Sequence, residues 1–240
     1  MENLIVDKRN YSDQIFNYLF DQIKSGKMKP GDKLPNEREL SQELGVSRPS
    51  LREALRAMSQ LGLVSTRQGG GSYINYFDDA YLKSILQYMT VISDDLLVDL
   101  VQVRKTLEAE ATRLAARNAT EEDLKTIERY ATERERLYME NRENLSGVRQ
   151  ELNRLDYQFH KSIAEAAKNK VIAAFIVSIH TTFTAHQNRV STKGELAGTV
   201  NTTHRELVKA LKQRDAEKAG ELMYCHLQTI EDALIELNAE

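Results

Sequence analysis

The chain of 240 residues has one cysteine, three prolines and no tryptophan. The lone Cys225 excludes an intrachain disulfide framework and a zinc site built from several cysteines. No segment approaches the ~20 consecutive apolar residues that span a bilayer, and residues 1–20 carry charges throughout, unlike a secretory signal. We therefore expect a cytoplasmic protein with no membrane partner.

A strong charge of either sign is also missing, since the net charge is −3. Residues 1–76 hold eleven Lys and Arg against nine Asp and Glu, and residues 77–240 hold 22 against 27. This small asymmetry does not by itself indicate a nucleic-acid partner. What matters is whether the positive side chains of the first part gather on one face.

Proline and glycine are concentrated early in the chain. All three prolines lie within the first 50 residues, the only glycine cluster is 69–71, and no proline follows residue 78. A long stretch without proline and with apolar residues at helical spacing is typical of an all-helical domain. We predict a mainly α protein with three parts: a winged helix-turn-helix domain over 1–76, a linker and first helix over 77–93, and an antiparallel bundle of six or seven helices over 94–240.

The order of elements in the first part indicates DNA binding. A short helix over 37–44 ends at Gly45, and a helix over about 48–61 follows with Ser47 as its N-cap. Two β runs, 63–67 and 72–75, are then joined by glycines, as a hairpin wing requires. A short helix, a glycine turn and a second helix form a helix-turn-helix, whose second helix enters the major groove.

The start of that second helix is polar and rich in donors. Arg48 and Arg52 are four residues apart and share a helix face, although such a pair can also be an ordinary solvated charge pair. Glycines at the wing tip would let it approach the sugar-phosphate backbone. The candidate DNA contacts are Arg38, Ser47, Arg48, Ser50 and Arg52, together with Gln68 and Gly69 of the wing.

The run from Pro35 to Leu55, followed by Leu61-Gly-Leu-Val and Gly69-Gly-Gly-Ser-Tyr-Ile, closely resembles the N-terminal domain of the GntR superfamily of repressors. The resemblance covers about residues 9–76. It implies that the seven candidates above contact double-stranded DNA. Helix-turn-helix proteins commonly bind palindromic operators with one unit on each half-site, so we expect a homodimer. Pro49 lies among them and has no backbone N–H to donate.

Histidines and one aspartate form a second pattern. Asp156 and His160 are four residues apart on one predicted helix, and His204 and His226 lie eleven residues on either side of Asp215, where a turn is expected. Two helices that run antiparallel from that turn place both histidines at the same level. Three histidines and one carboxylate suit Zn²⁺ or another divalent transition metal. The alternatives are a buried, hydrogen-bonded histidine and a surface pair of Asp156 with His160, while His180 is expected to line the same cavity without being a ligand.

The segments around Val103, Asp156, His204 and Met223 resemble the FCD effector domain of the FadR-type subgroup. The resemblance implies metal ligation by Asp156, His160, His204 and His226, with Zn²⁺ best suited and Ni²⁺ or Mn²⁺ as alternatives. It also places Arg104 in the effector pocket, where a guanidinium would bind a carboxylate bidentately. An ion pair of Arg104 with Glu108, four residues on, is the competing interpretation.

The sequence thus predicts a DNA-binding transcription regulator, a repressor by resemblance, controlled by a small organic acid. Two alternatives stay within this class: a regulator that responds to an acyl-CoA, and one that responds to the metal itself. A metal-dependent hydrolase is a third, but no additional acid or base stands out as the activator that such an enzyme needs. We therefore expect no enzymatic activity.

Overall fold

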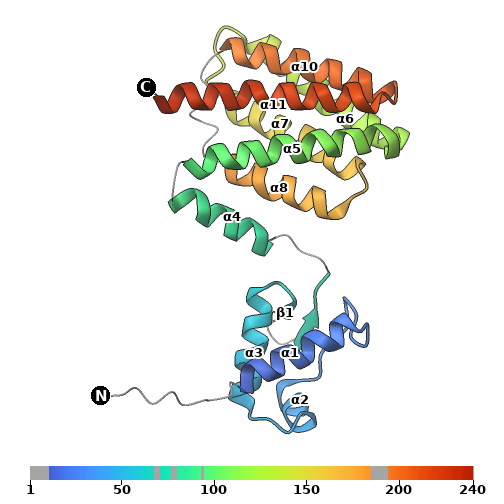
Figure 1. Ribbon diagram of the computed structural model, residues 1–240, viewed down its shortest axis with the longest axis vertical. Helices are drawn as coiled ribbons and strands as arrows, with labels where there is room; N and C mark the ends of the chain where they lie inside the picture. Colours follow the sequence, from blue (N-terminus) through green and yellow to red (C-terminus); the bar gives the residue numbers. More distant parts are fainter. Residues whose placement is uncertain (1–10, 68–70, 77–79, 93–94, 185–193, 240) are drawn as a thin grey trace. The chain divides into compact units, whose positions relative to one another are not determined.

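The computed structural model describes residues 11–67, 71–76, 80–92, 95–184 and 194–239 (Figure 1). The chain divides into two compact units, Met1–Tyr81 and Leu82–Glu240. The predicted wing residues Gln68 and Gly69 lie outside the described residues. Each unit has its own hydrophobic core, so each is considered separately below.

The first unit is a three-helix domain with a two-stranded antiparallel sheet, as the sequence predicts. Local side chains fix the helix starts: the Asn36 carboxamide accepts from the backbone N–H groups of Arg38 and Glu39 at 3.1 and 3.0 Å, and Ser47 Oγ accepts from that of Ser50 at 3.2 Å. The elements are α1 (Tyr11–Lys24), α2 (Glu37–Glu43), α3 (Arg48–Gln60), β1 (Val64–Arg67) and β2 (Gly71–Ile74).

The turn between α2 and α3 depends on Gly45, which adopts a φ of +63° that L side chains rarely reach. The apolar face of α3 then packs on α1, and both α2 and β1 also contact α3. The strands pair with Val64 opposite Ile74, and both side chains are buried. Together these contacts confirm the predicted winged helix-turn-helix.

The second unit is all helical and confirms the predicted bundle. Helix α5 packs along α11, and α7 lies against α5, α6 and α8 (Figure 1). The helices described in it are α4 (Ala80–Ile92), α5 (Asp95–Asn118), α6 (Glu121–Asn141), α7 (Arg149–Ala166), α8 (Lys170–Thr184), α10 (Gly194–Lys212) and α11 (Ala216–Ala239).

The spacing of apolar residues also predicts helices over 169–190 and 199–213. The expected helix over 169–190 is described as far as Thr184, and residues 185–193 lie outside the described part. The expected helix over 199–213 is described from Gly194 to Lys212, so it extends at least five residues before its predicted start. The sequence predicts Thr120 as an N-cap, since the acidic Glu121 and Glu122 follow it. This cap is present, and Thr120 and Asp123 form a reciprocal capping box.

The core of the bundle contains both apolar and polar side chains. Phe159, Ile163, Leu207 and Leu227 belong to one buried apolar cluster. His160 adjoins Phe159 in the sequence and is buried as well. Among the described residues, no helix combines the length and apolar character that a membrane span requires.

Candidate metal centre and nucleic-acid interface

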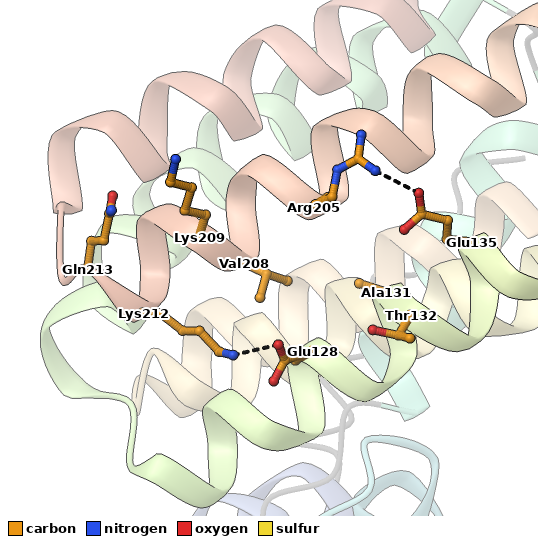
Figure 2. A pocket seen from close by; sticks show the side chains of 9 residues that line it. All are labelled: Glu128, Ala131, Thr132, Glu135, Arg205, Val208, Lys209, Lys212 and Gln213. Carbon is orange, nitrogen blue, oxygen red and sulfur yellow. Dashed lines mark hydrogen bonds and ion pairs between the residues drawn. The ribbon is translucent and has the colours of Figure 1, made fainter.

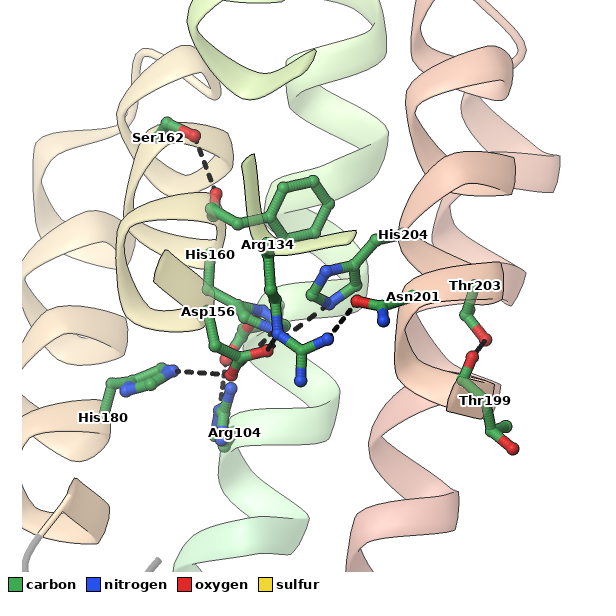
Figure 3. Close-up of polar contacts among 12 residues, drawn as sticks. Arg104, Arg134, Asp156, His160, Ser162, His180, Thr199, Asn201, Thr203 and His204 are labelled. Atoms are coloured by element: carbon green, nitrogen blue, oxygen red, sulfur yellow. Dashed lines mark hydrogen bonds and ion pairs between the residues drawn. The ribbon is translucent and has the colours of Figure 1, made fainter. Parts of the chain in front are cut away.

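Four histidines and one aspartate converge inside the helical bundle from four helices. Asp156 and His160 come from α7, His180 from α8, His204 from α10 and His226 from α11. Each of the four imidazoles is at most 4% exposed. Figure 3 shows Asp156, His160, His180 and His204 pointing toward one another.

The ligand atoms lie close enough to share one cation. Those of His160, His204 and His226 are all within 4.8 Å of one another, and so are those of Asp156, His160 and His180. The ring centroids of His204 and His226 are 4.9 Å apart, as their equal distance from the turn at Asp215 predicts. The structure therefore brings together all four predicted ligands, and His180, which is expected to line the same cavity, lies in the same cluster.

Asp156 lies at the centre of this cluster. Its carboxylate oxygens are 3.7 Å from Nε2 of His204 and 3.9 Å from Nε2 of both His160 and His180. These separations are too long for hydrogen bonds. Two ligands at about 2.1 Å from a tetrahedral zinc ion lie about 3.4 Å apart, so the observed gaps are close to those of a shared cation.

Several buried ring nitrogens in the cluster have no hydrogen-bond partner within the described residues. They are Nε2 of His160 and both nitrogens of His204. A buried polar atom without a partner costs about 1–3 kcal/mol, and a metal ion would satisfy a bare imidazole nitrogen. The donor set of imidazoles and one carboxylate therefore fits a divalent transition metal.

Two charged side chains next to the cluster, Glu108 and Arg104, orient His160. Its Nδ1–H donates to the Glu108 carboxylate, which also accepts from Nε of Arg104. All three side chains are at most 3% exposed. Because Nδ1 carries the proton, the Nε2 lone pair of His160 faces the cluster, which is the arrangement of a histidine ligand backed by a carboxylate. The ion pair of Arg104 with Glu108, one of the two sequence interpretations, does form, and a role for Arg104 in effector binding stays a prediction.

Arg134 of α6 is a member of the site that the sequence reasoning missed. Its Nε lies 3.3 Å from the Asp156 carboxylate, and its Nη1 donates to the Asn201 amide oxygen (Figure 3). Arg134 continues the buried stripe Leu124, Ile127, Ala131 at helical spacing. That position is the signal that could have identified it, because an arginine on a core face needs a buried partner.

The pKa directions agree with a site of ionised carboxylates in which His180, His204 and His226 are neutral. Burial lowers the pKa of His180, and also that of His226, to about 3, and it holds the pKa of His204 well below its usual value. Burial alone would raise the pKa of Asp156 and of Glu108. Nearby groups, His160 and Arg134 for Asp156 and Arg104 for Glu108, hold both pKa values well below the usual range. At neutral pH the imidazoles of His204 and His226 therefore keep lone pairs for a metal.

A separate groove lies on the surface between α6 and α10 (Figure 2). Val208 and Ala131 line it, Arg205 Nη1 donates to Glu135 at 2.9 Å, and Lys212 pairs with Glu128. None of its lining residues is a histidine. The groove is therefore distinct from the buried cluster and offers no comparable ligand set.

In the first unit, the predicted DNA contacts gather around the start of α3. The side chains of Arg48 and Arg52 are 57% and 64% exposed. Arg38 and Ser47 are also exposed, and Ser50 is half-buried with its hydroxyl 2.8 Å from that of Ser47. The donors of the recognition helix are thus accessible on its polar face, opposite the buried Leu51.

Comparison with known proteins now gives the family. The description "Bacterial regulatory proteins, gntR family" matches residues 11–74, and "FCD domain" matches residues 99–229. The chain belongs to the GntR family of bacterial regulators. Its members with an FCD domain are transcription regulators and not enzymes, so the hydrolase alternative is set aside, and the chain is a DNA-binding transcription regulator.

Relatives of similar length support this assignment. An uncharacterized HTH-type transcriptional regulator, YcbG of Bacillus subtilis (strain 168), is 31% identical over 98% of this chain and 96% of its own. LutR of the same organism is 28% identical over 88% and 95%, and the Glc operon transcriptional activator of Escherichia coli (strain K12) is 29% identical over 91% and 86%. A solved structure, Streptococcus agalactiae GntR, has a TM-score of 0.68 at 24% identity over 92% of this chain and 99% of its own, which shows the likeness in fold.

Proposed function

We propose that this GntR regulator is a homodimeric repressor whose binding to a palindromic operator is controlled by a small carboxylate held at a divalent metal. The observation that carries the proposal is the buried cluster around Asp156, in which four histidines converge within the all-helical unit. Nothing in the helix-turn-helix unit resembles it, since that unit has no histidine.

Asp156, His160, His204 and His226 would hold the metal, and Zn²⁺ suits this donor set best, with Ni²⁺ and Mn²⁺ as alternatives. Zn²⁺ can expand from four ligands to five, and Mn²⁺ accepts six. With four protein ligands, such a metal would therefore keep at least one position for a carboxylate oxygen. Nε2 of His180, which is not among the four proposed ligands, lies 3.9 Å from the Asp156 carboxylate. It would contact the effector.

The charges around the cluster favour an anionic effector. The two buried arginines, Arg104 and Arg134, balance the two buried carboxylates, Glu108 and Asp156. Because burial keeps three of the histidines neutral, a divalent cation would leave two positive charges uncompensated in a buried site. A small hydroxy or keto acid would offset that charge, whereas the acyl chain of an acyl-CoA needs an apolar channel.

DNA binding would use the polar start of α3 in the major groove, with Arg38 of α2 and the wing beside it. The excess of only two positive charges over residues 1–76 implies few phosphate contacts for each unit. Two units acting on two half-sites would compensate, which is the reason for proposing a homodimer. For the acid to act as a signal, it must bind two arrangements of the dimer with different free energies.

Metal analysis after extensive dialysis tests the metal directly. We expect about one Zn²⁺, Ni²⁺ or Mn²⁺ per chain, and its loss in His204→Ala. Glu206→Ala is the matched control, because Glu206 is exposed on the same helix two residues away. A chain that purifies without metal, and whose melting temperature does not respond to added Zn²⁺, Ni²⁺ or Mn²⁺, would contradict the proposal.

A thermal-shift screen of small organic acids, with and without a chelator, tests the effector. We expect hydroxy or keto acids to raise the melting temperature only while metal is present. If an acid raises the melting temperature equally in the presence of the chelator, the acid does not need the metal to bind. A change in DNA affinity with metal alone would instead favour a regulator that senses the metal itself.

Arginine variants test the docking of α3. We expect Arg48→Ala and Arg52→Ala each to abolish operator binding while the circular dichroism spectrum is unchanged. Arg56→Ala is the control, because Arg56 is exposed on the same helix one turn further from its start. Operator affinity at the level of the unaltered chain in both variants would refute this docking.

A further inference from the structure

The exposed recognition surface contains one carboxylate, Glu37 of α2, that pairs with both arginines at the start of α3. Nη2 of Arg52 donates to Oε2 of Glu37 at 2.8 Å, and Nε of Arg52 lies 3.2 Å from the same oxygen. Arg48 Nη2 lies 3.9 Å from that oxygen. A negative charge therefore touches the two side chains that we expect to meet DNA.

The pairing leaves one edge of the Arg52 guanidinium open. Glu37 engages Nε and Nη2, which form the side edge of the group, and Nη1 has no hydrogen-bond partner within the part of the chain that the structure describes. A guanidinium carries five N–H donors in a rigid fork. The end edge, formed by Nη1 and the second N–H of Nη2, is therefore free to donate two parallel hydrogen bonds, the arrangement that reads O6 and N7 of guanine.

Structural support alone does not account for the position of Glu37. The side chains of Arg52 and Glu37 are 64% and 35% exposed, and exposed ion pairs add little to stability. The packing of α2 on α3 is already provided by buried Leu40 and Leu51 of the apolar core. On a surface that approaches phosphates, however, a carboxylate repels the backbone of any sequence.

We propose that Glu37 is a specificity-determining positioning residue of the DNA-binding unit. It holds Arg52 with its end edge free for a guanine, and it weakens binding to DNA that offers phosphates but no matching base. This inference rests on the docking of α3 proposed above and is independent of the metal and the effector. The DNA bound best would contain a guanine opposite Arg52 in each half-site.

The test uses the full-length chain and two DNA probes. The first is a random-sequence duplex pool, and the second is a duplex enriched from that pool by the unaltered chain. We expect Glu37→Gln to bind the random pool several-fold more tightly, and the ratio of the two affinities to fall roughly tenfold. The slope of log affinity against log salt for the random pool should increase by about one phosphate contact.

Glu39→Gln is the matched control. Glu39 lies on the same helix two residues away, is exposed, and has no ion pair with a described residue. Glu39→Gln removes the same charge from the same helix without affecting the contact with Arg52. The ratio of its affinities for the enriched duplex and the random pool should therefore stay within about twofold of that of the unaltered chain. An equal loss of discrimination in both variants would overturn the proposal, because net charge alone would then explain it.

Two further outcomes also overturn the proposal. One is an unchanged affinity ratio in Glu37→Gln. The other is a parallel fall of both affinities with a lower melting temperature, which would make Glu37 only a brace between α2 and α3. Arg52→Ala, measured on the same probes, separates these failures from a failure of docking: if it binds the enriched duplex as tightly as the unaltered chain, α3 does not read DNA through Arg52.

Discussion

The two units of this regulator bury different kinds of side chain. In the helix-turn-helix unit the described buried residues are apolar apart from Ser12 and Ser41, and its charged side chains lie on the surface. In the helical unit, buried arginines, carboxylates and histidines lie beside the apolar core. The first unit exposes the charged groups that we propose to meet DNA, whereas the second buries the polar groups that we propose to bind a metal and a small acid.

This difference has an energetic consequence. An apolar core stabilises a unit irrespective of pH and ligands, because burial of apolar surface depends on neither. A buried polar cluster stabilises a unit only while each charge is paired and each histidine is neutral or bound. We therefore expect the stability of the second unit to follow protons and metal, and that of the first unit to be insensitive to both.

Acidification of the metal-free protein should produce the largest difference between the units. The pKa of His180 and of His226 is lowered to about 3 by burial, and that of His204 is also low, so the unfolded chain binds protons more tightly. The free energy of unfolding is therefore highest above about pH 6.5. It decreases as pH falls toward 3, by up to about 1.4 kcal/mol per pH unit for each histidine. Calorimetry from pH 7.5 to 5 should show the helical unit losing stability steeply.

The first unit is the internal control for that titration, because all five histidines follow residue 159. Its transition should move little over the same range. Equal pH dependence of both transitions would show that the buried histidines are not the cause.

Removal of Glu108 should have the next largest effect. Glu108→Ala leaves Arg104 as a buried charge without its carboxylate and deprives His160 Nδ1 of its acceptor, which should cost about 3–5 kcal/mol. Only the transition of the second unit should shift in calorimetry. Glu110→Ala, two residues along α5 with a side chain 50% exposed, should shift it by less than about 1 kcal/mol.

Truncation of a buried apolar side chain in the first unit should destabilise that unit alone. Leu51 of α3 is fully buried, so Leu51→Ala should destabilise the helix-turn-helix unit by about 2–5 kcal/mol. The transition of the second unit and its metal content should be unchanged. A fall in metal content with Leu51→Ala would show that the two units are not independent.

Helix caps should be the feature on which the two units differ least. Asn36 accepts from two backbone N–H groups at the start of α2, and Thr120 forms a capping box at the start of α6. Asn36→Ala and Thr120→Ala should each cost about 1 kcal/mol, each in its own unit. Chemical denaturation at pH 7.5 measures both, and a metal-dependent cost for Thr120→Ala would contradict this equivalence.

Much of the fold follows from local sequence patterns. The winged helix-turn-helix, the long helices and the cap at Thr120 depend on periodicity, glycine positions and neighbouring side chains, which act over a few residues. The proximity of His204 and His226 could also be predicted. Two antiparallel helices joined by a short turn place residues at equal distances from the turn side by side. The helical conformation of residues 194–198 could not be predicted, since Gly194 and Gly198 are weak helix formers.

The sequence by itself therefore determined the two units, the family and the four candidate ligands. Only the tertiary structure decided which partners these residues have: Glu108 with His160, Arg134 with Asp156, and Glu37 with Arg52. These pairs join different helices, and their contact depends on the rotation and tilt at which the helices pack. That geometry is set by the packing of all the core side chains together, so no local pattern of residues records it.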